Sequence, residues 1–157
     1  ADQMTHIGGN LVFNHSRRHI EIWGDSGHSL TTPAFQTDKG LYLVHVLAGN
    51  GAGPIETGIT CAVKHVEVFE LGSGTIVSGG YFVMPHLGNW SQWKWSNCIQ
   101  CVLQQNVQYQ IRISNDHYST NMSQLNHFAL YRPPNGGSGF PFNRVNIAQI
   151  ELLQIHQ

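Results

Sequence analysis

Charged residues are scarce in this sequence. They make up 11% of its 157 residues, whereas about a quarter of a typical globular chain is charged. Eight Lys and Arg stand against nine Asp and Glu, so the chain has neither a basic surface that would follow nucleic-acid phosphates nor an acidic tail. No apolar run approaches the length of a membrane span. We therefore expect no nucleic acid and no membrane among its partners.

Cysteine is also scarce, and the three cysteines cannot all pair internally. Cys98 and Cys101 form a Cys-x-x-Cys spacing, and Cys61 alone is too few to complete a four-cysteine zinc site. Polarity comes instead from Asn, Gln, Ser, Thr, Gly and ten His, beside 41% hydrophobic residues, a balance that excludes a disordered chain. No signal peptide is visible, but the composition is typical of secreted β-proteins, and we expect an extracellular or secreted location.

Helical periodicity is rare, and the chain is divided instead into short apolar or alternating segments. The predicted strands are Leu41–Ala48, Ile59–Leu71, Val107–Ser114, Leu125–Tyr131 and Val145–Ile155. In the second of these the alternation changes phase at His65–Val66, which predicts a bulge or a strand boundary. The last segment also fits a helical face, and we assign it as a strand.

Turns rich in Gly and Asn separate these segments. They are predicted at Gly8–Asn10, Gly24–Asp25, Gly49–Pro54, Gly72–Gly74, Gly79–Gly80 and Pro133–Gly139. Short strands at a spacing of about ten residues predict an all-β fold, namely an antiparallel β-sandwich of the jelly-roll type. The length suits one domain, and we expect residues 1–157 to form it.

The densest group of aromatic residues is Trp90-Ser91-Gln92-Trp93-Lys94-Trp95. In a strand, Trp93 and Trp95 would point to one face and Trp90 to the other. Because Trp is highly buried on average, we expect Trp93 and Trp95 in the core. Trp90 has polar neighbours, and both a core position and a role as a surface platform stay open for it.

Five short elements follow one another around this group. They are Tyr42–Gly53, Trp90–Trp93, Val102–Leu103, Gln110–Ile113 and Leu125–Phe128. In this order and spacing, over roughly residues 40–131, they resemble the carbohydrate-binding modules of the family 6 and family 35 type. Those modules are β-sandwiches appended to polysaccharide-degrading enzymes.

The resemblance implies a sugar site at the apex of the sandwich, in a cleft between loops. Its stacking aromatic residue would be Trp90, and its hydrogen-bonding amide would be Gln124, where the family usually has Asn. The loop after the first element would lie beside the cleft and bring in Asn50. The resemblance further implies a non-catalytic module that binds oligo- or polysaccharide and targets a partner or covalently linked catalytic domain to it.

The chemistry of saccharides suits these residue types. An aromatic ring covers the apolar face of a sugar, and amides both donate hydrogen bonds to its hydroxyls and accept them. Further candidates for ligand contact, which could also serve only as turn formers, are Asn115, Asp116, Tyr118 and Asn121. Such a surface suits neutral saccharides, although Arg112 or Arg132 could serve a uronate.

Calcium is the one cofactor that the resemblance implies, as a structural ion. The family's usual pair of Glu near the N-terminus has no obvious counterpart here. Glu21 and Asp25 are the candidate ligands, because hard oxygen donors suit calcium.

Two other functions stay open. A structural or attachment jelly roll would form an oligomer through a large apolar face. A cupin-like metal-dependent enzyme would bring three His together, and His65-x-Glu67 matches that motif only in part. The acidic residues form no glycosidase motif, and no Gly-x-Ser-x-Gly elbow occurs, so we expect no enzymatic activity.

Overall fold

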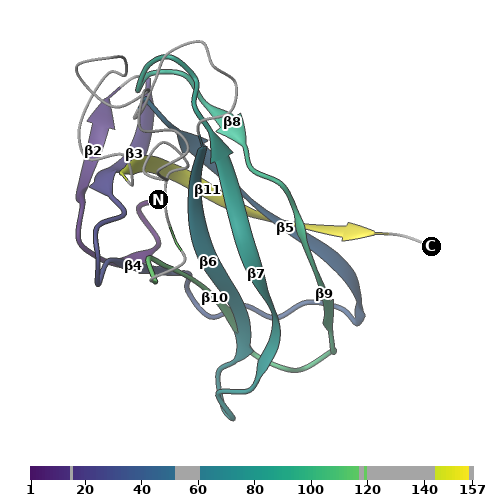
Figure 1. Cartoon of the computed structure of the whole chain (residues 1–157). Coiled ribbons are helices and arrows are strands. Elements are labelled where there is room, and N and C mark those ends of the chain that lie inside the picture. The colour runs from purple at the N-terminus through teal and green to yellow at the C-terminus, as the bar shows by residue number, and fades with distance from the viewer. Residues whose placement is uncertain (15, 52–60, 117–118, 120–143, 156–157) are drawn as a thin grey trace.

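The computed structural model describes residues 1–14, 16–51, 61–116, 119 and 144–155, which form strands and loops (Figure 1). The strands are β1 (Thr5–Ile7), β2 (Asn10–Asn14), β3 (Arg17–Trp23), β4 (Ser29–Thr31), β5 (Gly40–Gly49), β6 (Cys61–Glu70), β7 (Ile76–Pro85), β8 (Lys94–Trp95), β9 (Ile99–Leu103), β10 (Tyr109–Ser114) and β11 (Val145–Ile155). No helix occurs in this part of the chain, and so it offers none that could cross a membrane.

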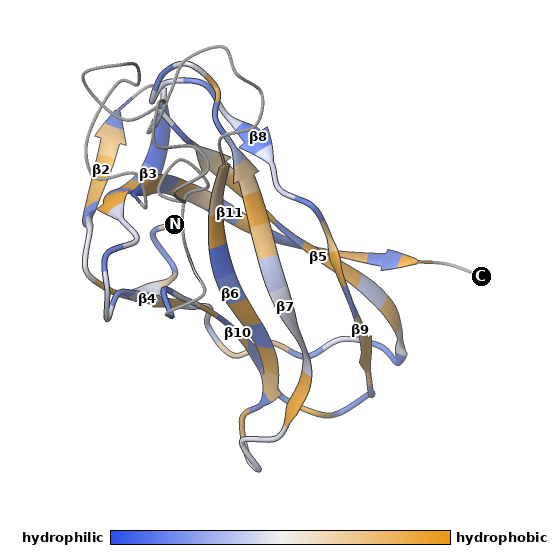
Figure 2. Ribbon diagram, in the orientation of Figure 1, coloured by the Kyte–Doolittle hydropathy of each residue, from blue (hydrophilic) through white to orange (hydrophobic). Residues whose placement is uncertain are grey.

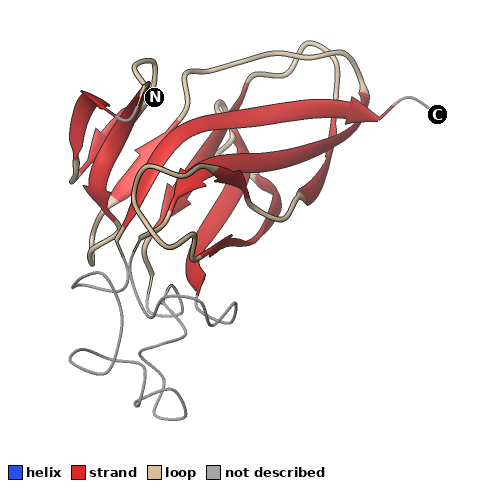
Figure 3. Cartoon of the chain, turned by 90° about the horizontal axis from the view of Figure 1, so that it is seen from above, coloured by secondary structure: helices blue, strands red, loops and turns tan. Residues whose placement is uncertain are grey.

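The strands form two sheets in which every pairing is antiparallel. The first sheet has the order β1-β4-β10-β6-β7, and the second has the order β2-β3-β11-β5-β8, with β9 also pairing with β5. The two sheets lie in separate layers (Figure 3), and side chains from both form one core cluster. The predicted antiparallel β-sandwich is therefore confirmed.

The core follows from the alternation of the strands. In β10, Tyr109, Ile111 and Ile113 are buried, while the residues between them are more exposed. Val44 and Val46 of β5, in the other sheet, belong to the same core cluster. Apolar residues recur in this way along both sheets (Figure 2), and each fully buried side chain of this size stabilises the fold by about 1.5–3 kcal/mol.

The predicted bulge at His65–Val66 is wrong. Strand β6 pairs with β10 without interruption from His65 to Glu70, and its one register shift, against β7, lies between Val68 and Phe69. The apparent change of phase has another cause: Lys64 is fully buried. The inward face therefore includes a lysine, and His65 is on the outward face.

The predicted turn at Gly79–Gly80 is also wrong, because both residues lie inside β7. A Cβ at Gly80 would stand 3.2 Å from the Cγ2 atom of Ile99 in β9. The glycine thus lets β7 and β9 approach closely. The segment Val145–Ile155 is a strand, as predicted, and the predicted strand Leu125–Tyr131 lies outside the described residues.

One end of the sandwich is closed by hydrogen bonds between the segments at the ends of β5 and β7. The amide of Asn50, directly after β5, donates to the carbonyl of Met84 at 2.9 Å, and the Asn50 carbonyl accepts from the backbone N–H of Leu87 at 2.9 Å. These bonds join the last residues of β5 to the end of β7 across the two sheets. We refer to this end as the apical end.

Candidate functional site

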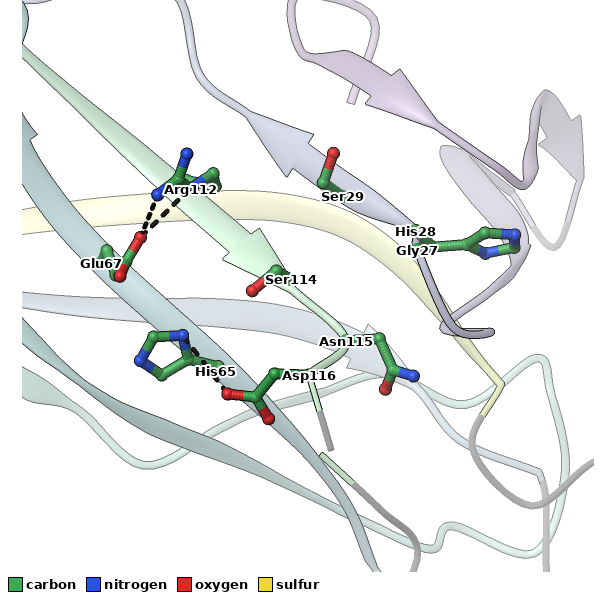
Figure 4. A pocket seen from close by; sticks show the side chains of 9 residues that line it. All are labelled: Gly27, His28, Ser29, His65, Glu67, Arg112, Ser114, Asn115 and Asp116. Carbon is green, nitrogen blue, oxygen red and sulfur yellow. Dashed lines mark hydrogen bonds and ion pairs between the residues drawn. The ribbon is translucent and has the colours of Figure 1, made fainter. Parts of the chain in front are cut away.

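A pocket of about 360 Å³ lies over the outer face of the first sheet, toward the apical end. Its lining is polar and comes from β4, β6, β10 and the turns beside them (Figure 4). The lining residues are Gly27, His28, Ser29, His65, Glu67, Arg112, Ser114, Asn115 and Asp116.

The strand register brings the central residues of this pocket together. His65 is the Cα partner of Ser114, and Glu67 is the partner of Arg112. All four lie outward because the residues between them on β6 and β10 are buried. Facing partners on one side of an antiparallel pair have Cβ atoms about 5 Å apart, so these side chains form a continuous polar patch.

The turn after β3 forms the second wall. The Nδ1 atom of His28 accepts hydrogen bonds from the backbone N–H groups of Gly24 and Asp25 at 3.1 and 3.2 Å. In this arrangement Nδ1 is the acceptor for both groups and faces the turn rather than the pocket. The backbone N–H of Asn115 donates to the carbonyl of His28 at 3.2 Å, and this bond holds the turn against the end of β10.

The charged groups in the lining are compensated within the pocket. Arg112 donates from Nε and Nη2 to one carboxylate oxygen of Glu67, at 3.1 and 2.5 Å. Asp116 accepts hydrogen bonds from the backbone N–H and the hydroxyl of Ser119 at 2.9 and 3.1 Å. Its other oxygen lies 3.6 Å from Nδ1 of His65. The pocket thus presents polar groups without a large field of one sign.

An aromatic ring stands at the edge of this pocket. Tyr81 of β7 is the Cα partner of His65, and their ring centroids are 5.2 Å apart. Its hydroxyl donates to Asp116 at 3.4 Å, and its side chain is 36% exposed. Tyr81 is not among the residues predicted from the sequence; the available signal was its outward phase in an alternating strand, beside two glycines.

Lys64 lies beneath the pocket and is fully buried. Its ammonium donates to Oδ1 of Asn115 at 2.6 Å and to the carbonyl of Gly24 at 3.1 Å, so it links the two walls. Burial lowers the pKa of Lys64 to about 7, while the charges of Asp25 and Asp116 act in the opposite direction. The lysine holds the site together from within the core.

The predicted ligand residues fall into separate places. Asn115 and Asp116 both line the pocket. Asn50 is only 1% exposed, and its amide is bound to Met84, a position that disagrees with the predicted contact to a sugar. Further predicted contacts lie outside the described residues, namely Gln124, Tyr118 and Asn121.

Trp90 lies at the apical end but not in the pocket lining. It is half-buried, and a Cβ at Gly51 would stand 2.8 Å from its ring atoms Cγ and Cδ2. Its carbonyl accepts from the amide of Asn146 at 3.3 Å. The ring is therefore seated on the backbone after β5, where only glycine leaves room for it.

The prediction that Trp93 and Trp95 share the core is wrong. Both are half-buried, and neither belongs to the core cluster. Trp95 stacks on His45, with ring centroids 4.0 Å apart and planes inclined by 10°. Trp93 instead meets the edge of His19, at 5.0 Å. The two rings pack on different parts of the second sheet, because only Trp95 is in a strand.

The two predicted calcium ligands do not form a fitting donor set. Both carboxylate oxygens of Asp25 accept hydrogen bonds from Arg144, at 2.8–3.2 Å. This bond lowers the pKa of Asp25. Calcium needs six to eight oxygen ligands, yet within the described residues no three His, Cys, Asp or Glu side chains, Glu21 included, come together as a metal site.

The fold of this chain is similar to the folds of several solved structures. No family model and no curated protein matches the sequence. A solved structure described as Xyl-CBM35 in complex with a glucuronic acid containing disaccharide matches over 96% of this chain and 86% of its own, with 13% identity and a TM-score of 0.60. A family 35 carbohydrate-binding module from Clostridium thermocellum matches over 99% and 95%, with 14% identity and a TM-score of 0.58.

A longer protein also contains this fold. The isomalto-dextranase of Arthrobacter globiformis T6, complexed with panose, matches over 97% of this chain but only 23% of its own, with 18% identity and a TM-score of 0.56. At these identities the likeness concerns the fold. The sandwich therefore has the fold of family 35 carbohydrate-binding modules, as the sequence resemblance implied.

Proposed function

We propose that this chain is a non-catalytic carbohydrate-binding module, and that the pocket over the first sheet contributes to its sugar site. The observation that carries the proposal is the composition of that pocket. It combines hydroxyl, amide and imidazole groups with an aromatic ring at its edge, in the fold that known carbohydrate-binding modules have. Sugars offer both an apolar face and a ring of hydroxyls, and they require both kinds of contact.

Both kinds of sugar contact can be assigned to residues of this chain. Ser114 and Asn115 offer groups that donate and accept hydrogen bonds, and Tyr81 offers a ring that a pyranose can cover. Trp90 provides a second aromatic contact at the apical end, as the family resemblance implies. We expect modest affinity, because a few exposed contacts leave little free energy after the cost of ordering ligand and side chains.

One of the structurally similar proteins supports a targeting role. The Arthrobacter isomalto-dextranase contains this fold as less than a quarter of its chain. We propose that the present module likewise holds a linked or partner enzyme against oligo- or polysaccharide, in an extracellular setting. A structural jelly roll that only assembles with itself would instead bind no glycan.

The test is glycan binding by the intact chain and three variants. Tyr81→Ala removes the ring at the pocket, and Trp90→Ala removes the ring at the apical end. Phe13→Ala is the matched control, because Phe13 is a 74% exposed aromatic residue on β2 of the other sheet. We expect a glycan array and calorimetry to show binding that weakens about tenfold for Tyr81→Ala and is unchanged for Phe13→Ala.

Circular dichroism would establish that each variant is folded. Binding that only Trp90→Ala removes would move the sugar site from the pocket to the apical loop. Absence of binding to every glycan, with and without added calcium, would contradict the proposed function and favour the structural alternative.

A further inference from the structure

The pair Glu67–Arg112 lies at one end of the pocket, on β6 and β10 (Figure 4). Two of the three donor nitrogens of Arg112, Nε and Nη2, point to the same oxygen of Glu67. The guanidinium also lies over the ring of Phe69, 5.4 Å from its centroid. The Glu67 side chain is 15% exposed, against 47% for Arg112. Arg112 is thus held along β6 by a carboxylate on one side and an aromatic ring on the other.

We infer that Glu67 is a specificity-determining residue, which restricts the pocket to neutral saccharides by occupying Arg112. The inference rests on the proposed sugar-binding function. An arginine is the side chain best suited to bind the carboxylate of a uronate, because its guanidinium can donate two parallel hydrogen bonds. In this chain the carboxylate of Glu67 already accepts the hydrogen bonds from Nε and Nη2 of Arg112.

The other charges of the pocket act in the same direction. Asp116 supplies a second carboxylate to the lining, and like charges repel. Lys64 lies beneath the pocket, but it is fully buried and donates to Asn115 and Gly24. His28 accepts two backbone N–H groups at Nδ1, so this nitrogen offers no N–H to a ligand. A uronate would therefore meet an arginine whose Nε and Nη2 donors are already directed at Glu67.

A neutral sugar meets no such obstacle. Its hydroxyls can bond to Ser29, Ser114 and Asn115, which carry no charge. The ion pair between Glu67 and Arg112 stays intact, since no charge needs to be exchanged. The same pocket thus accepts a neutral ring and disfavours an acidic one of equal size.

Glu67→Gln tests this directly. Glutamine keeps the shape and can still accept a hydrogen bond, but it no longer neutralises Arg112. Glu70→Gln is the matched control, because Glu70 lies on the same strand, outside the pocket, where it bonds to Ser73. Both variants change the net charge of the chain by the same amount, so a general electrostatic effect would appear in both.

The experiment is calorimetric titration with a neutral disaccharide and with the same disaccharide carrying a glucuronic acid, at pH 8, where unperturbed histidine is neutral. We expect the intact chain to bind the neutral sugar about tenfold or more tightly than the uronate. Glu67→Gln should raise uronate affinity about tenfold and leave neutral affinity within about twofold, while Glu70→Gln behaves like the intact chain.

Two results would overturn the inference while leaving sugar binding in place. One is an intact chain that binds the uronate as tightly as the neutral sugar. The other is a folded Glu67→Gln variant with an unchanged preference. Should that variant not fold, the preference of the intact chain still decides. A chain that binds neither sugar would refute the proposed function itself, and the inference with it.

Discussion

The ammonium of Lys64 donates a 2.6 Å hydrogen bond to Oδ1 of Asn115, from a position with no exposure to solvent. A second bond, to the carbonyl of Gly24, joins the same ammonium to the opposite wall of the pocket. Lysine is among the residues least often fully buried. Here it lies in the core under the pocket and sets the separation of two loops that belong to different strand pairs.

The first prediction concerns the pH dependence that this burial creates. The pKa of Lys64 is about 7 in the folded chain, against 10.5 for a free lysine. Between these values the unfolded chain binds a proton that the folded chain lacks, so the free energy of unfolding rises with pH. We expect urea unfolding at pH 6, 7, 8 and 9 to show this rise, and Lys64→Met to lack it.

The slope is the informative quantity in that experiment. The absolute stability of Lys64→Met depends on two opposing effects, because the variant removes a buried charge but leaves two polar partners unpaired. Lys94→Met is the control, since Lys94 is exposed on β8, and it should keep the slope of the intact chain. Equal slopes for the intact chain and Lys64→Met would show that Lys64 does not titrate in this range.

Lys64 also explains why a bulge at His65–Val66 is wrongly predicted from the sequence. The strand over residues 61–70 was predictable from its apolar alternation, but a rule that places charged residues outward puts Lys64 on the wrong face. The change of phase at His65–Val66 then looks like a bulge. Ala62, Val66 and Val68 mark the buried face of the strand correctly. Lys64 can lie on the same face because its ammonium bonds to Gly24 and Asn115, which are distant in sequence.

The pocket was predictable only in part for a related reason. Asn115 and Asp116 stood out because they follow a clean strand. His65-x-Glu67 and Arg112 also had outward phase, but Glu67 and Arg112 are 45 residues apart. Their meeting depends on the register of β6 against β10, which is a non-local property. Local patterns identified β5, β6, β10 and β11, whereas the assembly of the site required the pairing between strands.

The second prediction concerns the packing of Trp90 against Gly51. A methyl group at Gly51 would stand 2.8 Å from Cγ and Cδ2 of Trp90 and 2.9 Å from the backbone carbon of Asn89. Neither the ring of Trp90 nor the backbone of Asn89 can move away easily from the added methyl group. We expect Gly51→Ala to lower the free energy of unfolding by about 1–3 kcal/mol and to shift the fluorine resonance of Trp90 in a fluorotryptophan-labelled chain.

Gly72→Ala is the matched control for this substitution. No atom lies within 4 Å of a Cβ at Gly72, so neither stability nor the Trp90 resonance should change appreciably. If Gly51→Ala leaves the Trp90 resonance in place, the ring is not seated on Gly51 and the aromatic contact at the apical end must be placed elsewhere.

The third prediction concerns the ion pair between Asp25 and Arg144. The hydrogen bond from Arg144 lowers the pKa of Asp25 from its ordinary value of 3.8. The stabilisation is therefore complete above that value and is lost as pH falls through the lower pKa of the folded state. Both side chains are about a third exposed, so we expect Arg144→Gln to cost at most about 1 kcal/mol at pH 7.

Chemical denaturation from pH 7 down to pH 2 would measure this difference. The stability gap between the intact chain and Arg144→Gln should close at the acidic end. Arg18→Gln serves as the comparison, because the Arg18–Asp2 pair is longer, at 3.5 Å, and more than half exposed. A gap for Arg144→Gln that persists at pH 2 would mean that Arg144 stabilises the fold through packing rather than charge.

The fourth prediction concerns thiol reactivity. All three cysteines are free, but only Cys98 is exposed. Burial raises the pKa of Cys61 and raises that of Cys101 to about 11, and the thiolate is the reactive form. At pH 8 we expect a chromogenic disulfide reagent to modify one thiol per folded chain quickly and all three after denaturation. Cys98→Ser should abolish the fast reaction, because Cys98 is the exposed thiol. A fast thiol that remains in this variant would mean that β6 or β9 opens in the native state.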